Sequence, residues 1–183
     1  MYHLQIPCVA IHSKYVPQCD EKLFIKGDPY QTNQIFLNLA KNAFDAIKNH
    51  GNLLKISSKL VTSDWIKIDE NIGKDYCHSE EKWEKVLNDN NEFALIEFED
   101  NGKGIAERDL KNVFQAFYTT KGRDKGTGLG LSISSDIAKR HGGNIAVKSI
   151  EGEWTTFQIL IPLLNEKKEN QISKIEEINE FLK

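Results

Sequence analysis

The sequence has no long apolar run. No stretch approaches the roughly 20 apolar residues that a membrane-spanning helix needs, and the N-terminus lacks the basic-then-apolar pattern of a secretory signal. The net charge of −3 comes without a basic face, which argues against nucleic acid as a partner. We therefore expect a soluble, cytoplasmic chain that contacts no membrane itself, whether or not a parent protein is anchored in one.

Familiar sites for metals and phosphates are also missing. The three cysteines (Cys8, Cys19 and Cys77) are an odd number without a metal-ligand spacing, which predicts reduced thiols. The glycine cluster at Gly126–Gly130 lacks the lysine of a P-loop. Neither this cluster nor the one at Gly102–Gly104 supplies the third glycine or alanine of a dinucleotide fingerprint. The two commonest phosphate motifs are therefore excluded.

The sequence does contain a strand pattern that ends in an acid. Ala94, Ile96 and Phe98 alternate along one face, and Asp100 continues their row. A carboxylate in an apolar row is costly to bury unless it accepts hydrogen bonds, and the exocyclic amine of adenine would supply a donor. An ordinary Asp-Asn-Gly turn explains the same residues without a ligand.

A second cluster, Gly-Thr-Gly-Leu-Gly-Leu at 126–131, leads into a helix predicted for Ser132–Arg140. Free backbone N–H groups at a helix start, preceded by glycines, favour phosphate binding. Taken alone, either glycine cluster is weak evidence for a nucleotide site.

Upstream, Gly27-Asp28-Pro29 predicts a helix start, with Asp28 as the cap, and Gly51 predicts its end. Asn38, Asn42 and Asp45 fall at i, i+4 and i+7, so they share a face beside the apolar stripe. Mg²⁺ would take carboxamide oxygens there, but a solvated polar face fits the same spacing.

Together and in this order, the segment Asn38–Ala46, the acid-tipped strand, Val113–Lys121 and the glycine cluster resemble the nucleotide-binding domain of sensor histidine kinases and the gyrase, heat-shock-90 and mismatch-repair ATPases. The resemblance covers roughly Glu21 to Leu163. It implies an α+β fold, a two-layer α/β sandwich in which a mixed, mostly antiparallel sheet lies under about three helices. It also implies ATP and Mg²⁺ as cofactors and an ATP lid over Gly122–Gly126.

The resemblance assigns roles to individual residues. Asn42 is implied as the magnesium ligand, with Asn38 as a second candidate. Lys121 is implied to reach the terminal phosphates, so Asn38, Asn42 and Lys121 form the expected catalytic set. The full set expected to contact nucleotide is Asn42, Asp45, Asp100, Gly102, Gly104, Ile105, Phe117, Thr120, Lys121, Gly126, Thr127, Gly128, Leu129, Gly130, Leu131 and Thr156.

Two details refine this expectation. Phe114 and Phe117 are expected to anchor the core more than to touch ligand. The family usually begins its last strand with Gly-Thr-Thr or Gly-Thr-Ser, whereas this chain has Trp154-Thr155-Thr156. This difference argues against a backbone contact to adenine at that position. We expect the Thr156 hydroxyl to contact adenine through water instead.

The resemblance implies the ATP-binding catalytic domain of a two-component sensor histidine kinase, an enzyme that passes the γ-phosphoryl group to a histidine. Gyrase-like ATPases carry a glutamate at the position of Asn38, and an amide is no general base, which favours transfer over hydrolysis. None of the five histidines has the acceptor setting, so the acceptor belongs to a separate dimerisation domain in the phosphorelay, with a response regulator downstream. A hydrolysing gyrase-like module and a non-catalytic nucleotide-sensing scaffold are the alternatives.

The remaining segments flank this domain. Residues 1–20 are expected to form lead-in strands, residues 21–164 the catalytic domain, and residues 165–183 a charged tail with helical spacing. An insertion at 62–92 carries Trp65 and Trp83, which either fold it onto the sheet or form a partner-binding surface.

Overall fold

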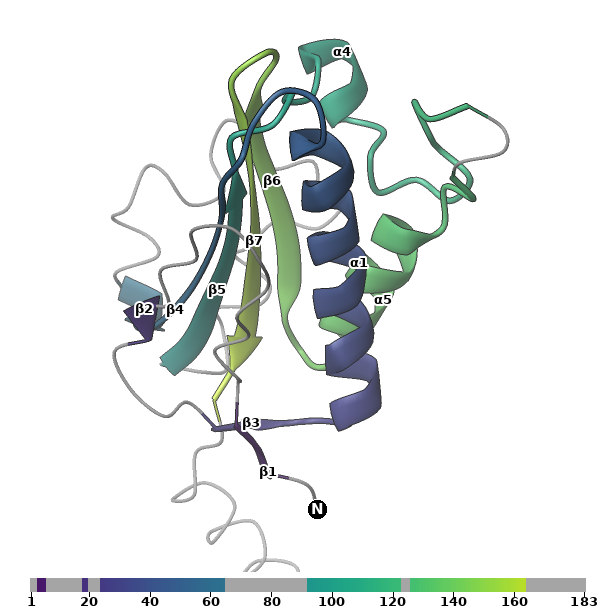
Figure 1. Cartoon of the computed structure of the whole chain (residues 1–183). Helices are drawn as coiled ribbons and strands as arrows, with labels where there is room; N and C mark the ends of the chain where they lie inside the picture. The colour runs from purple at the N-terminus through teal and green to yellow at the C-terminus, as the bar shows by residue number, and fades with distance from the viewer. Residues whose placement is uncertain (1–2, 6–17, 20–23, 65–91, 123–125, 164–183) are drawn as a thin grey trace, which may run out of the picture.

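The structure is a computed structural model that describes residues 3–5, 18–19, 24–64, 92–122 and 126–163. In this part of the chain, one layer is a five-stranded sheet and the other consists of helices on one of its faces (Figure 1). The strand order is β2 (Gln18–Cys19), β4 (Leu54–Thr62), β5 (Glu92–Asp100), β7 (Trp154–Pro162) and β6 (Asn144–Ile150). All neighbouring strands are antiparallel except β2 and β4. The predicted two-layer α/β sandwich with a mixed, mostly antiparallel sheet is confirmed.

A smaller two-stranded sheet precedes the first helix. It pairs β1 (His3–Gln5) with β3 (Phe24–Lys26) in antiparallel fashion. Strand β1 lies within the predicted lead-in segment 1–20, whereas β3 lies in the predicted catalytic domain. Most of the predicted insertion at 62–92 and the tail at 165–183 lie outside the described residues.

Helix α1 (Pro29–Ile47) begins as its sequence predicts. Asp28 caps it, because Asp28 Oδ1 accepts a hydrogen bond of 2.8 Å from the Tyr30 N–H, and Pro29 occupies the first turn. The helix ends four residues before Gly51, whose N–H donates to the Ile47 carbonyl at 3.0 Å. The predicted apolar stripe faces the sheet, with Ile35, Leu39, Ala43 and Ile47 all buried.

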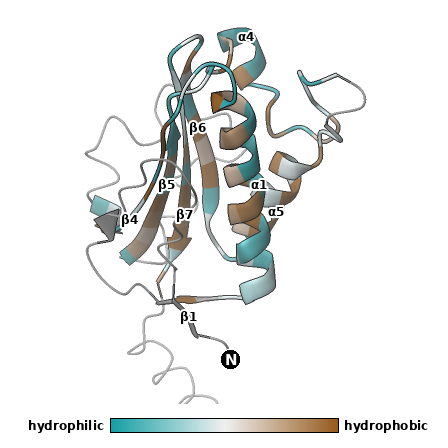
Figure 2. Ribbon diagram, viewed as in Figure 1, coloured by the Kyte–Doolittle hydropathy of each residue, from teal (hydrophilic) through white to brown (hydrophobic). Residues whose placement is uncertain are grey.

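The strand register explains how the core is formed. Ala94, Ile96 and Phe98 of β5 belong to the same buried cluster as Ile35 and Leu39 of α1. Hydrophobic segments lie along α1 and along the neighbouring strands β5 and β7 (Figure 2), and residues of all three belong to the buried cluster between the layers. The alternating row predicted from the sequence is therefore the row under α1, and Asp100 ends it.

Helix α5 (Gly130–Arg140) lies beside α1 on the same face of the sheet. It ends in a glycine cap: Gly142 has φ +71°, and the Gly143 N–H donates to the Ala138 carbonyl at 2.9 Å. His141 links the two helices, because its Nε2 accepts from the Asp28 N–H at 3.3 Å. A short helix, α4 (Glu107–Leu110), follows β5.

Candidate functional site

Asp100 is a buried acid at the end of β5. It is 3% exposed, and its Oδ1 accepts a hydrogen bond of 2.9 Å from the Gly102 N–H. Burial raises the pKa of Asp100 from 3.8 to about 6; the Gly102 N–H opposes this rise and the charge of Glu99 adds to it. An acid in this setting still has hydrogen-bonding capacity to offer a ligand.

Gly102 brings the loop after Asp100 against α1. A Cβ at this position would lie 2.6 Å from the Ala46 carbonyl carbon and 2.7 Å from Asp100 Oδ1, so only glycine fits. The next residue also contacts the helix, since the Lys103 N–H donates to the Ala46 carbonyl at 3.3 Å. The acid is therefore held beside the last turns of α1.

Two hydroxyl groups follow Asp100 across the sheet, one on β7 and one on β6. Thr155 of β7 lies directly opposite Asp100, and its Oγ1 is 3.0 Å from Ser149 Oγ of β6. Ser149 Oγ also accepts a hydrogen bond of 2.8 Å from the Ile105 N–H. Gly104 places Ile105 there by passing against the Ile150 carbonyl with φ +66°. Ser149 and Thr155 were not among the residues predicted for the site.

Thr156 is not placed as we predicted. It pairs with Glu99, the residue before Asp100, so its side chain lies on the face of the sheet opposite to that of Asp100. Thr155 occupies the expected place because successive strand residues point to opposite faces. The alternation of Phe157, Ile159 and Ile161 already carried this signal, since Thr155 continues their row.

The amide-bearing face of α1 meets the start of α5. Asn38 Nδ2 donates to the Gly130 carbonyl at 3.0 Å and to Ser134 Oγ at 3.2 Å. No side chain caps the first turn of α5. Backbone N–H groups at such an uncapped helix start suit an anion.

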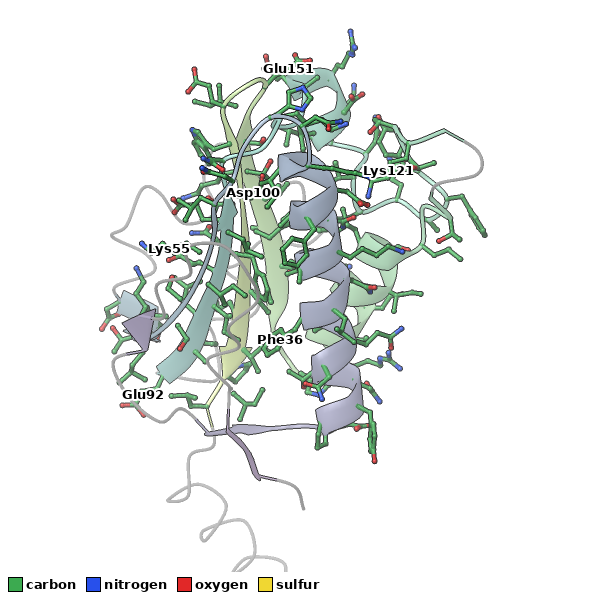
Figure 3. All side chains as sticks on the ribbon, in the orientation of Figure 1. Phe36, Lys55, Glu92, Asp100, Lys121 and Glu151 are labelled. Atoms are coloured by element: carbon green, nitrogen blue, oxygen red, sulfur yellow. The ribbon has the colours of Figure 1, made fainter. Side chains whose placement is uncertain are left out.

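Lys121 contacts the same face of α1 one turn further on. Its Nζ lies 2.6 Å from Asp45 Oδ2 and 3.1 Å from Asn42 Oδ1. As the spacing predicts, Asn38, Asn42 and Asp45 line one face, and this face gathers residues from two distant segments. Asp100 and Lys121 lie on either side of the same end of α1 (Figure 3).

The oxygens of Asn42 and Asp45 fit a hard cation. They already converge on one positive group, the ammonium of Lys121. Among the described residues, no group of three or more histidine, cysteine, aspartate or glutamate side chains forms a metal site. Mg²⁺ often binds through one or two protein oxygens and completes its shell with phosphates and water. The donor set therefore suits a metal that arrives with a phosphate ligand.

The glycine cluster packs against the segment that carries Lys121. Gly128 has φ +67°, and a Cβ there would lie 2.4 Å from the Phe117 carbonyl carbon, while its own carbonyl accepts the Phe117 N–H at 2.9 Å. Gly126 lies against Thr119 and Lys121. Thr127 and Leu129 connect this contact to α5, Leu131 lies in the first turn of α5, and Thr120 is exposed next to Lys121. Residues 123–125 of the predicted lid lie outside the described residues.

Phe117 does not anchor the core, so that prediction is wrong. It is 74% exposed and has φ +66°, whereas Phe114 packs edge-on against Phe157 with ring centroids 6.4 Å apart. Helix α4 ends at Leu110, seven residues before Phe117, so a helical spacing from Leu110 to Phe117 does not continue that far. An exposed aromatic residue thus lies next to the glycine cluster.

Comparison with known proteins agrees with this geometry. Residues 27–165 match the family described as histidine kinase-, DNA gyrase B-, and HSP90-like ATPase. Sensor kinase CckA of Brucella abortus is 35% identical over 144 residues, which are 79% of this chain and 14% of that protein. Sensor histidine kinase ZraS of Salmonella typhimurium is 33% identical over 140 residues, which are 76% of this chain and 23% of that protein.

A solved structure shows the same fold. The nucleotide-free catalytic domain of histidine kinase ThkA superposes with a TM-score of 0.54 at 24% identity, covering 81% of this chain and 78% of that one. Within the described residues, no helix combines the length and apolar character needed to cross a membrane. The chain belongs to the histidine kinase-, DNA gyrase B- and HSP90-like ATPase family, and its relatives named above are sensor kinases.

Proposed function

We propose that this chain is the ATP-binding catalytic domain of a two-component sensor histidine kinase, transferring the γ-phosphoryl group of ATP to a histidine on a separate dimerisation domain. The observation that carries the proposal is the meeting of three distant segments along the second half of α1, from Asn38 to Ala46. Lys121 contacts Asn42, the start of α5 contacts Asn38, and the loop after Asp100 contacts Ala46. Family membership supports the same conclusion.

Asp100 is the residue proposed to recognise adenine. With a pKa of about 6 it is mostly ionised at neutral pH, so it can accept a hydrogen bond from the exocyclic amine. Thr155 lies opposite it on the neighbouring strand and is the hydroxyl best placed to assist, directly or through water. Guanine presents an oxygen at the corresponding position, so an acceptor such as Asp100 favours adenine.

Asn42 is the proposed magnesium ligand, with Asn38 as the second candidate. Bound Mg²⁺ would neutralise charge on the phosphates during transfer. Lys121 would hold a terminal phosphate as a point charge, and Gly126, Gly128 and Gly130 would let backbone N–H groups approach the phosphates. Catalysis would then consist mainly of positioning and charge stabilisation.

Asn38 supports transfer over hydrolysis. Its amide nitrogen is engaged with Gly130 and Ser134, and an uncharged amide cannot take a proton from water near neutral pH. We also propose that the acceptor histidine lies on the dimerisation domain, that a response regulator acts downstream and that the chain is cytoplasmic. This chain spans less than a quarter of the length of the named sensor kinases, so the activity of a whole kinase is proposed as well.

Phosphotransfer to an acceptor protein tests the proposal. The chain is incubated with Mg²⁺ and radiolabelled ATP, together with the dimerisation domain encoded in the same parent gene. We expect acid-labile, base-stable phosphohistidine on that domain, and none when Asn42→Ala replaces the wild type. ATP binding without transfer to the acceptor would reject the kinase assignment, and steady ATP hydrolysis by this chain alone would favour the gyrase-like alternative.

A further inference from the structure

Asp45 is an acid on the face of α1 that meets the proposed phosphate end of the site. Its Oδ2 lies 2.6 Å from Lys121 Nζ, and the same ammonium group lies 3.1 Å from Asn42 Oδ1. One cation thus bridges a carboxylate and a carboxamide that lie about one helical turn apart. The chain itself favours a positive charge at this point.

The ion pair is open enough to exchange partners. The side chains of Lys121 and Asp45 are 29% and 44% exposed. A pair this exposed adds little net stability, because water and salt screen it. Lys121 can therefore leave Asp45 at small cost when a more highly charged partner arrives.

A nucleotide changes the charge balance around Asp45. A triphosphate carries several negative charges, and one ammonium group cannot neutralise both a phosphate and Asp45. If Lys121 turns to a phosphate, the Asp45 carboxylate faces like charge, which is unfavourable. A divalent cation removes this conflict because it attracts the phosphates and Asp45 together.

We propose that Asp45 makes nucleotide binding dependent on a divalent cation, by repelling the metal-free nucleotide and supporting the metal-bound form. The inference rests on the proposed function, since it takes the phosphates to lie beside Asn42. In the free chain, Lys121 holds the place of that cation on Asn42 and Asp45. Asp45 thereby acts as a positioning residue for the cation and touches no transferred group.

Calorimetric ATP binding tests the inference on the 183-residue chain. The dissociation constant is measured once with excess Mg²⁺ and once with EDTA for the wild type, Asp45→Asn and Glu92→Gln. The third protein is a charge-matched control, because Glu92 is an exposed acid at the opposite end of β5 from Asp100. The quantity compared is the ratio of the two dissociation constants, so a uniform change in affinity cancels.

We expect Asp45→Asn to lower the EDTA-to-magnesium ratio about tenfold, mainly through tighter binding of metal-free ATP, and Glu92→Gln to leave it unchanged. Mn²⁺ followed by electron paramagnetic resonance gives a second readout, in which Asp45→Asn should weaken the metal in the ternary complex. An unchanged ratio in Asp45→Asn, or an equal fall in Glu92→Gln, would overturn the inference while nucleotide binding still stands. If the wild type bound no ATP in either buffer, the proposed function itself would fail.

Discussion

The two ends of the candidate site are built in different ways. At the Asp100 end, a carboxylate that is 3% exposed is held by strand register, by a backbone N–H and by a glycine that presses on α1. At the Lys121 end, three side chains meet through contacts that are partly open to solvent. The first end is fixed by the fold, whereas the second depends on side chains that can change partners.

This difference matches what each end is proposed to bind. A flat base needs one donor and acceptor pattern held in place, and preorganised groups bind it without further ordering. Phosphates and a metal bring high charge. Without them, another group must neutralise the charge of the residues that would bind them. The ion pair of Lys121 with Asp45 serves this purpose. Substitutions at the two ends should therefore act on different properties.

Gly102→Ala should have the largest effect on stability, because Gly102 lies at the rigid Asp100 end. A Cβ at Gly102 would lie within 2.7 Å of the Ala46 backbone and Asp100 Oδ1, so the loop or the helix must shift. We expect a loss of about 2 to 3 kcal/mol in the free energy of unfolding, measured by urea denaturation. Gly122→Ala is the matched control, since a Cβ at Gly122 would meet nothing within 4 Å. Equal stability of the two variants would show that the Asp100 end is not rigid.

Asp100→Asn tests the recognition role of the same end. The amide keeps the shape of the side chain but presents a donor where the carboxylate presents only acceptors, which leaves one polar group mismatched. We expect Mg-ATP affinity to fall by about 1 to 3 kcal/mol in calorimetry. Glu99→Gln is the control, because Glu99 is exposed and belongs to the other face of the sheet. Unaltered affinity in Asp100→Asn would remove Asp100 from the site.

The pH dependence of Asp100 should separate stability from binding. Its pKa in the folded chain is about 6, against 3.8 for the ordinary group, so the folded state holds the proton more strongly than the unfolded state. Stability from this group is therefore fully present below about pH 4 and is lost as pH rises through 6, by about 1 to 2 kcal/mol allowing for solvent screening. ATP affinity should change in the opposite direction, since the ionised acid accepts the adenine amine.

The measurement compares the free energy of unfolding of the wild type and Asp100→Asn from pH 4 to pH 8. The difference between the two proteins isolates the acid from every other titrating group. We expect the wild type to lose stability relative to Asp100→Asn as pH rises through 6. A difference that stays constant over the whole range would mean that Asp100 is not held in a desolvated place.

Sequence patterns of short range predicted much of this molecule. The cap at Asp28 and the inward row that ends in Asp100 are confirmed, because both depend on residues a few positions apart. The prediction that Thr156 lies at the site was wrong by a single residue. Thr155 lies there instead, because a shift of one position turns a strand side chain to the other face. The core role predicted for Phe117 was wrong because the helix before it ends at Leu110 and the helical spacing does not extend to Phe117.

The contact between Lys121 and Asp45 could not be predicted from local patterns. The two residues are 76 positions apart, and neither the spacing on α1 nor the segment at Tyr118–Lys121 indicates that they meet. The resemblance assigned both residues to the nucleotide site and implied nothing about their pairing in the absence of ligand. The two residues meet in the folded chain, where the glycine cluster packs against Phe117 and Lys121 and Lys121 contacts Asn42 of α1.

Lys121→Gln should have the smallest effect on stability and thereby completes the comparison. The substitution removes an ion pair between side chains that are 29% and 44% exposed, so the free energy of unfolding should change by less than about 1 kcal/mol. Mg-ATP affinity should nevertheless fall, since Lys121 is proposed to hold a terminal phosphate. Urea denaturation and calorimetry on the same preparation test both statements. A loss of stability as large as that of Gly102→Ala would mean that the Lys121 end is as much a part of the fold as the Asp100 end, and the division between a fixed and an exchangeable end would then be lost.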